Sequence, residues 1–197
     1  MGAMCTVVER SAAILCADDE KAARIIAGTL ARFGDGALRY ALNSGIRVRL
    51  LRAGERYRDA SAALKRIGVD VDAWPVPPAG LFVVEERAVL LRCATPMTVA
   101  HEFGHALDCA LGGGLYRSGY DTEIRGAFSR ARRFVTPYAA TGLDEYFAES
   151  LRAFVEVNDD DSPWPNATKE SLATVDPPMY RYLESLVAGF GAVPCRL

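Results

Sequence analysis

Apolar positions follow a helical period in the first part of the chain and then alternate with basic residues. Ala22, Ile25, Ile26, Leu30 and Phe33 would share one face of a helix, and a glycine-containing turn follows them. From residue 46 to 51, aliphatic residues alternate with arginines, as in a strand with one solvated face. In chain order the pattern predicts a strand over 12–17, helices over 19–33 and 35–43, a strand over 46–51 and a helix over 55–67.

The middle of the chain changes from short strands to one long amphipathic helix. An extended, proline-rich loop at 74–78 precedes two apolar segments, 81–84 and 88–92, which flank a polar turn and predict paired strands. Thr95 and Pro96 then provide a helix N-cap and a first-turn proline, and three consecutive glycines end the helix. Its expected buried stripe consists of Ala100, Phe103, Leu107 and Leu111. Residues between these positions are expected on a different face.

After this helix the remaining pattern is largely helical. Further helices are predicted over 120–134, 141–157 and 178–190. Thr141 and Asp144 have the spacing of a capping box at the start of the second of these. We therefore predict an α+β protein with a small mixed sheet in a front lobe of about residues 1–111 and a helical back lobe of about 112–197. Both lobes are expected in one domain, since 197 residues suit a single domain.

Composition excludes several classes of protein. The net charge of −2 provides no basic field for nucleic acid, so no nucleic-acid partner is expected. No apolar run reaches the roughly 18 residues of a membrane span, and no signal peptide is visible. Localisation stays open between a cytoplasmic protein, a secreted one and a delivered effector or toxin. Oligomeric state is also open, with a monomer expected. Five cysteines without a C-x-x-C pair argue against a disulfide framework and a cysteine zinc site.

The chemistry begins with the chain's two histidines, His101 and His105, which are four residues apart with Glu102 between them. On a helix, positions i and i+4 lie one turn apart on the same face, so both imidazoles can reach one metal ion. This is the H-E-x-x-H pattern of zinc hydrolases, in which the glutamate is the general base. The pattern predicts a single catalytic Zn²⁺ held by the two histidines.

A catalytic zinc site usually has three protein ligands, and the third must here be a carboxylate or a cysteine. With no third histidine, the H-E-x-x-H-x-x-G-x-x-H class is excluded. The predicted helix over 141–157 provides Glu145 and Glu149, either of which could reach the metal. The same residues could instead form a solvated helix face in which Glu149 pairs with Arg152. Asp108 could orient a histidine from outside the ligand shell or be an ordinary helix C-terminal residue.

The segment from His101 to Asp108, followed by Glu145-Tyr146-Phe147-Ala148-Glu149, resembles the protease domain of anthrax lethal factor and the related bacterial Pro-Pro endopeptidases. The resemblance is close over about residues 88–154. It implies a zincin-like fold with Glu145 as the third zinc ligand and Glu149 as its support. It also implies that Tyr138, seven residues before the ligand, hydrogen-bonds the reaction intermediate. The variable loops transfer no substrate preference.

Together the residues and the resemblance predict a zinc metalloendopeptidase acting on a protein or peptide substrate. In this hypothesis Glu102 is the general base, and the strand 88–92 binds an extended peptide along its edge. Two other interpretations remain open. One is an intracellular regulatory zinc peptidase that cleaves a specific partner protein, and the other is a non-catalytic, zinc-stabilised binding or toxin module.

Overall fold

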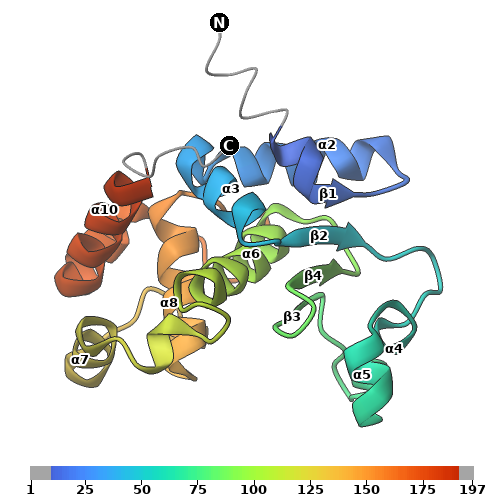
Figure 1. Ribbon diagram of the computed structural model, residues 1–197. Coiled ribbons are helices and arrows are strands. Elements are labelled where there is room, and N and C mark those ends of the chain that lie inside the picture. The colour runs from blue at the N-terminus through green and yellow to red at the C-terminus, as the bar shows by residue number, and fades with distance from the viewer. Residues whose placement is uncertain (1–9, 191–197) are drawn as a thin grey trace, which may run out of the picture.

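A four-stranded mixed sheet occupies one side of the protein, and a group of helices occupies the other (Figure 1). The structure, a computed structural model, describes residues 10–190. The strands are β1 (Leu15–Cys16), β2 (Arg47–Leu50), β3 (Gly80–Val83) and β4 (Ala88–Leu91), in the spatial order β1-β2-β4-β3. β1 and β4 run parallel to β2, whereas β3 runs antiparallel to β4. β3 is therefore an edge strand.

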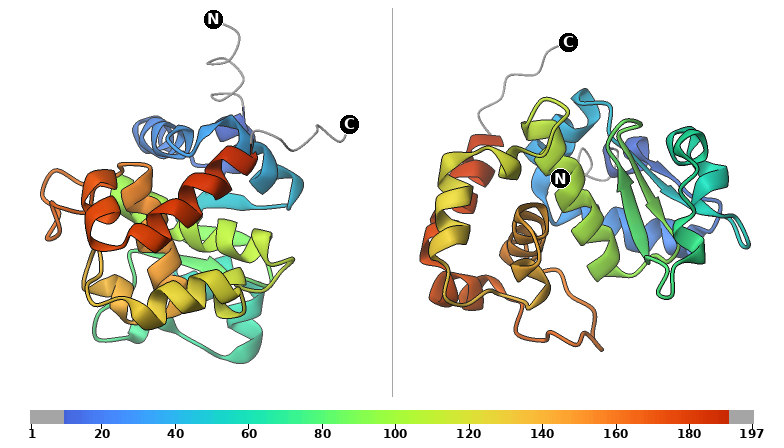
Figure 2. Two further views of the ribbon diagram at one scale, coloured as in Figure 1. Left: turned by 90° about the vertical axis from the view of Figure 1, so that its left-hand side faces the viewer. Right: turned by 90° about the horizontal axis from the view of Figure 1, so that it is seen from below.

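Most of the chain after β4 is helical. The α-helices are α2 (Glu20–Ala31), α3 (Gly34–Asn43), α4 (Tyr57–Ala60), α5 (Ala62–Ile67), α6 (Pro96–Leu111), α7 (Thr122–Arg130), α8 (Leu143–Phe154), α9 (Lys169–Val175) and α10 (Pro177–Phe190). Short 3₁₀ helices are η1 (Val71–Ala73), η2 (Arg117–Gly119) and η3 (Tyr138–Ala140). Seen from below, α6 lies between the sheet and the other helices of the back half (Figure 2). The active-site motif is thus on the central helix.

The predicted α+β arrangement is confirmed, with a small sheet formed early in the chain and helices later. The helices predicted over 19–33, 35–43 and 178–190 correspond to α2, α3 and α10. The two strands predicted on either side of the turn at 85–87 pair as β3 and β4. Periodicity identified the three helices because each has one face in the core and the other near solvent, whereas β4 is an apolar run buried on both faces.

Several local predictions were wrong. Residues 10–14 are helical, and only Leu15–Cys16 of the apolar run at 12–17 form a strand. The helix predicted over 55–67 is two helices, since Ser61 has an extended backbone and caps α5 by accepting from the Leu64 N–H. The helix predicted over 120–134 ends at Arg130. α9 was not predicted, because its seven residues are too few for a clear period.

The capping-box prediction for α8 was also wrong. The N-cap of this helix is Gly142, and no side chain caps it. Thr141 instead donates its hydroxyl to the carbonyl of Tyr138, 2.7 Å away, inside the preceding 3₁₀ turn. The Thr141 hydroxyl is therefore used inside the 3₁₀ turn and does not cap α8.

The strand predicted to bind a peptide along its edge is not an edge strand. β4 is paired on both sides, with β2 on one and β3 on the other. The free edge next to the motif belongs to β3, which packs against α6. Residue spacing cannot show which member of a hairpin lies outside, because that depends on the pairing of the hairpin with the rest of the sheet.

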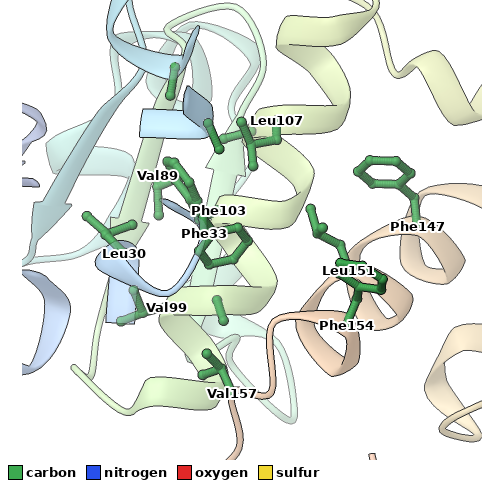
Figure 3. Close-up of a cluster of buried hydrophobic side chains, with 14 of the residues drawn as sticks. Leu30, Phe33, Val89, Val99, Phe103, Leu107, Phe147, Leu151, Phe154 and Val157 are labelled. Carbon is green, nitrogen blue, oxygen red and sulfur yellow. The ribbon is translucent and has the colours of Figure 1, made fainter. Parts of the chain in front are cut away.

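Helix α6 is buried on both faces, not on one stripe. Ala100, Phe103 and Leu107 are fully buried as expected, and Phe103 packs edge-to-face on Phe33 with ring centroids 4.9 Å apart (Figure 3). The opposite face, which includes His105 and Asp108, is buried as well because α8 packs on it. The histidines lie on a face other than the apolar stripe, but that face is an interface between helices.

Candidate metal centre

The active-site helix and α8 approach each other unusually closely at Gly104, the glycine between the two histidines. A Cβ atom at this position would lie 3.0 Å from the Cα and 3.2 Å from the Cβ of Ala148. A larger residue would therefore push the helices apart. Glu145 and Glu149 come from the same stretch of α8, so this close contact brings both carboxylates to the histidines.

Three side-chain atoms converge on one point between the helices. His101 Nε2 and His105 Nε2 are 3.1 Å apart, and Glu145 Oε2 lies 3.1 Å from the first and 3.3 Å from the second. This group is suited to hold one metal ion. Two ligand atoms about 2.05 Å from one ion at the tetrahedral angle are about 3.3 Å apart, so the spacing fits zinc. Glu145 Oε2 is buried without a hydrogen-bond partner among the described residues, as expected of a ligand atom.

The electrostatics of this group favour a positive charge. Burial works to lower the pKa of His101, but the carboxylates of Glu145 and Glu149 outweigh it and raise that pKa to about 10. Burial works to raise the pKa of Glu145, but His101 and His105 hold it well below its usual range. The negative charge between the helices can be neutralised by a proton on the imidazole or by a metal cation.

Glu149 holds His101 in place and does not lie on a solvated face. Its Oε1 atom is 2.9 Å from His101 Nδ1, so Nδ1 donates and the lone pair of Nε2 is free to point at a metal. Its Oε2 atom accepts from the hydroxyl of Thr136 at 2.7 Å. Arg152 donates to both oxygens at 2.9 Å and is itself fully buried. Of the two alternatives, the solvated helix face is therefore wrong, although the Glu149–Arg152 pair itself forms.

Glu102 lies on the same helix, under the start of the edge strand. Only 8% of this residue is exposed, and burial raises the pKa of its carboxyl group. The backbone N–H of Phe82 in β3 contributes a hydrogen bond that acts in the opposite direction. A Cβ atom at Gly80 would lie 2.5 Å from Glu102 Cγ, so glycine leaves the room that the carboxylate occupies.

Tyr138 reaches the centre from the 3₁₀ turn before α8. Its hydroxyl donates to Glu145 Oε1 at 3.1 Å, and its ring lies against that of His101 with centroids 5.5 Å apart. The side chain is 41% exposed, so its hydroxyl can also meet a ligand in the cleft. The structure thus brings Tyr138 together with His101, Glu102 and Glu145.

Asp108 forms its hydrogen bonds with Ser118 and not with the candidate metal ligands. Its two carboxylate oxygens accept from the backbone N–H of Ser118 at 2.9 Å and from the Ser118 hydroxyl at 2.5 Å. Burial raises the pKa of Asp108 to about 6. His105 Nδ1 is buried and has no hydrogen-bond partner within residues 10–190. The proposed role of Asp108 in orienting a histidine has no hydrogen bond to support it, whereas Asp108 does anchor the turn after α6.

A cleft runs beside the cluster and is lined mainly by apolar groups. The residues that line it come from around the start of β3 (Pro78, Ala79 and Gly80), from the first turn of α6 (Met97 and Thr98), and from Tyr138 and Trp164. His101, Glu102 and Glu149 also border the cleft. Sequence analysis missed Trp164, Thr136 and the buried position of Arg152. The one signal for Trp164 was a large aromatic residue in an otherwise polar, proline-containing loop.

The fold is that of a known group of peptidases. The structure of the PRO-PRO endopeptidase PPEP-2 from Paenibacillus alvei matches with a TM-score of 0.66, at 16% sequence identity, over 90% of this chain and 99% of that one. The zincin-like α+β fold expected from the resemblance is therefore confirmed. No protein-family model and no curated protein matches the sequence.

The expectations on a membrane span, a toxin role and the cysteines can also be compared with the structure. Within residues 10–190, no helix is long and apolar enough to cross a membrane, in line with the sequence. Neither the fold nor the site supports a toxin role. Cys16, Cys93 and Cys109 are free thiols, whereas Cys5 and Cys195 lie outside the described residues.

Proposed function

We propose that this protein is a zinc-dependent endopeptidase. One observation carries the proposal: His101 Nε2, His105 Nε2 and Glu145 Oε2 form a triangle with sides of 3.1, 3.1 and 3.3 Å beside a buried glutamate. Two imidazoles and one carboxylate are a common ligand set of catalytic zinc, and they leave a position for water. The match to a solved PRO-PRO endopeptidase supports the same class of activity.

Zinc bound by these three residues would lower the pKa of a coordinated water to about 7 and polarise the scissile carbonyl group. Glu102 accepts the proton from the attacking water and passes it to the nitrogen of the leaving amine. Its buried position raises the pKa of its carboxyl group, which suits a group that takes a proton and later returns it. The Tyr138 hydroxyl turns from Glu145 to donate to the oxyanion that develops on the carbonyl oxygen. Glu149 keeps His101 in one tautomer throughout.

The substrate we propose is a peptide or an exposed protein segment bound in extended form along the edge of β3, with the protein acting as a monomer. Gly80 starts this strand and lies directly over Glu102, so a chain paired with β3 would pass the general base. The apolar lining of the cleft favours peptides with apolar side chains near the cleaved bond over nucleic acid. Bonds between two prolines belong in the first assay, because the similar solved structure is named for them.

Of the alternatives, a non-catalytic zinc module is the less favoured one. A structural zinc site is closed by four protein ligands, whereas the group in residues 10–190 that could hold a metal has three members. A regulatory peptidase that cleaves one partner protein would use the same residues, and it would differ from the proposal only in substrate range.

The test combines metal analysis with a peptide-library cleavage assay. The purified protein should contain about one zinc per chain and should cleave peptides, and a chelator should abolish the activity. Glu102→Gln should keep the zinc and lower turnover by roughly 10²–10⁴-fold. Glu170→Gln, the same change at an exposed position on α9, is the matched control and should behave as the wild type. Full activity of Glu102→Gln, or activity that survives metal removal, would refute the proposal.

A further inference from the structure

The loop between α8 and α9 forms one wall of the cleft. This segment, residues 155–168, leaves the end of α8 and is drawn in orange in Figure 2. Trp164 lines the cleft together with Pro78 and Ala79. Its ring is parallel to that of Tyr138, with an angle of 5° between the planes and centroids 6.3 Å apart. Two aromatic rings thus line the cleft next to the candidate metal ligands.

Hydrogen bonds attach this loop to the start of the active-site helix. The backbone N–H of Met97, in the first turn of α6, donates to Asp159 Oδ1 at 2.8 Å. The hydroxyl of Ser162 lies 3.6 Å from the Met97 sulfur and accepts from the backbone N–H of Trp164 at 3.1 Å. The position of Trp164 relative to α6 is therefore held by named contacts, although the segment has no regular secondary structure.

Asn158 connects Trp164 to the groups behind the metal centre. Its Nδ2 atom donates to the backbone carbonyl of Trp164 at 2.9 Å, and its Oδ1 atom accepts from Arg152 Nη1 at 3.0 Å. The same guanidinium group holds Glu149, which in turn bonds His101. One continuous chain of hydrogen bonds thus joins a candidate metal ligand to an aromatic wall of the cleft.

The pocket between the loop and β3 is lined mainly by apolar side chains. Pro78, Ala79, Met97 and Trp164 contribute apolar surface, and no lysine or arginine is among the residues that line it. The charged and metal-binding groups lie to one side, at His101. A pocket of this kind gains free energy by covering an apolar side chain, and its lining has no lysine or arginine to pair with an acidic one.

We propose that Trp164 determines specificity in this protein. In this proposal an apolar side chain of the peptide, next to the cleaved bond, lies against the indole and the ring of Tyr138. Asn158 is the positioning residue: by donating to the backbone carbonyl of Trp164, it fixes where the indole lies in the cleft. The inference rests on the proposed peptidase function and adds to it the type of side chain that one subsite accepts.

The first experiment compares the zinc-loaded wild type, Trp164→Ala and Trp164→Phe on peptides that vary at each position around the cleaved bond. Trp164→Ala should lower kcat/KM by roughly 10- to 100-fold for peptides with a large apolar residue at one position, mainly through KM. Peptides with glycine at that position should be cleaved nearly as before. Trp164→Phe keeps a ring and should restore most of the preference. Zinc content and melting temperature should be unchanged, since the side chain lies at the surface of the cleft.

A second variant separates the effect of the position of Trp164 from the effect of its apolar side chain. Asn158→Asp keeps the acceptor for Arg152 but loses the donor to the carbonyl of Trp164. It should change the preference at the same peptide position, in the same direction and by less than Trp164→Ala. A general loss of folding would instead lower kcat for all peptides alike.

A third measurement needs no turnover. The chain has two tryptophans, so in Trp74→Phe/Glu102→Gln the remaining indole is Trp164. A peptide that the wild type cleaves should shift its fluorescence on binding. An unchanged emission at saturation, or an unchanged preference in Trp164→Ala, would overturn the inference and leave the proposed function intact. A zinc-loaded wild type that cleaves no peptide at all would refute the proposed function, and the subsite with it.

Discussion

Replacing Arg152 by methionine should destabilise the protein strongly, because it takes from the buried carboxylate of Glu149 the arginine that holds both of its oxygens. Arg152 is 0% exposed and Glu149 is 1% exposed. Two N–H groups of the guanidinium each donate to Glu149 at 2.9 Å. In Arg152→Met the carboxylate would keep only His101 Nδ1 and the Thr136 hydroxyl as partners. Removing one member of a buried ion pair costs about 3–5 kcal/mol of the free energy of unfolding.

The lowered pKa of Glu149 gives a similar magnitude for the free energy at stake. Burial works to raise that pKa, but His101 and Arg152 lower it to about 2. Relative to an ordinary value of about 4.5, the shift corresponds to about 3 kcal/mol. Because the native pKa is the lower one, this stability is present above about pH 4.5 and is lost as the pH falls toward 2. The difference between wild type and Arg152→Met should therefore shrink on acidification.

The assay is urea unfolding followed by circular dichroism, in chelator, at neutral pH and near pH 3. At neutral pH, Arg152→Met should lose about 3–5 kcal/mol, which for a chain of this size lowers the melting temperature by roughly 10 °C. The matched control is Arg24→Met, which removes an exposed partner of Glu20 and should cost less than about 0.5 kcal/mol. The double variant Glu149→Gln/Arg152→Met should recover part of the loss, because it leaves no carboxylate at position 149 without its arginine. A loss in Arg152→Met no larger than in Arg24→Met would refute the reasoning.

Three further changes test other parts of the structure. Tyr138→Phe removes one hydroxyl and should lower turnover by roughly 10²–10³-fold while metal analysis shows unchanged zinc. Gly80→Ala should lower kcat, because its Cβ would lie 2.5 Å from Glu102 Cγ, whereas Gly28→Ala has no atom within 4 Å and should leave kcat unchanged. Burial raises the pKa of Asp108 to about 6, so the native state holds a proton that the unfolded state has lost and stability falls as pH rises from about 4 to 6. Asp108→Asn should remove this slope, about 3 kcal/mol in all, in urea unfolding at a series of pH values with chelator.

Each of these has an outcome that contradicts it. Loss of zinc in Tyr138→Phe would mean that the hydroxyl supports the ligand Glu145 more than it supports the reaction. A fully active Gly80→Ala would mean that Glu102 can move without consequence and is not the base. If the free energy of unfolding of Asp108→Asn still falls between about pH 4 and 6 as in the wild type, other groups cause that fall.

The part of the site that could be predicted from sequence lies within single helices. The spacing of His101 and His105 fixes their relative position wherever α6 lies, because one turn of helix is a local geometry. The same argument made Glu145 and Glu149 candidates on one helix, but it could not decide between a metal ligand and a solvated face. The contact at Gly104 decides it, since it brings α8 against α6 and buries both carboxylates and Arg152.

Sequence by itself thus determined the order of most elements, the α+β class and two of the three candidate metal ligands, because periodicity and helix geometry act over a few residues. Tertiary structure decided what depends on segments far apart in the chain. It placed β3 and not β4 at the free edge, made the Glu149–Arg152 pair a buried support for His101, and set Trp164 beside Tyr138 in the lining of the cleft. The physical reason is burial: a carboxylate or an indole acquires its role from the groups around it, and some of these come from distant parts of the chain, as Thr136 and His101 do for Glu149, 13 and 48 residues away.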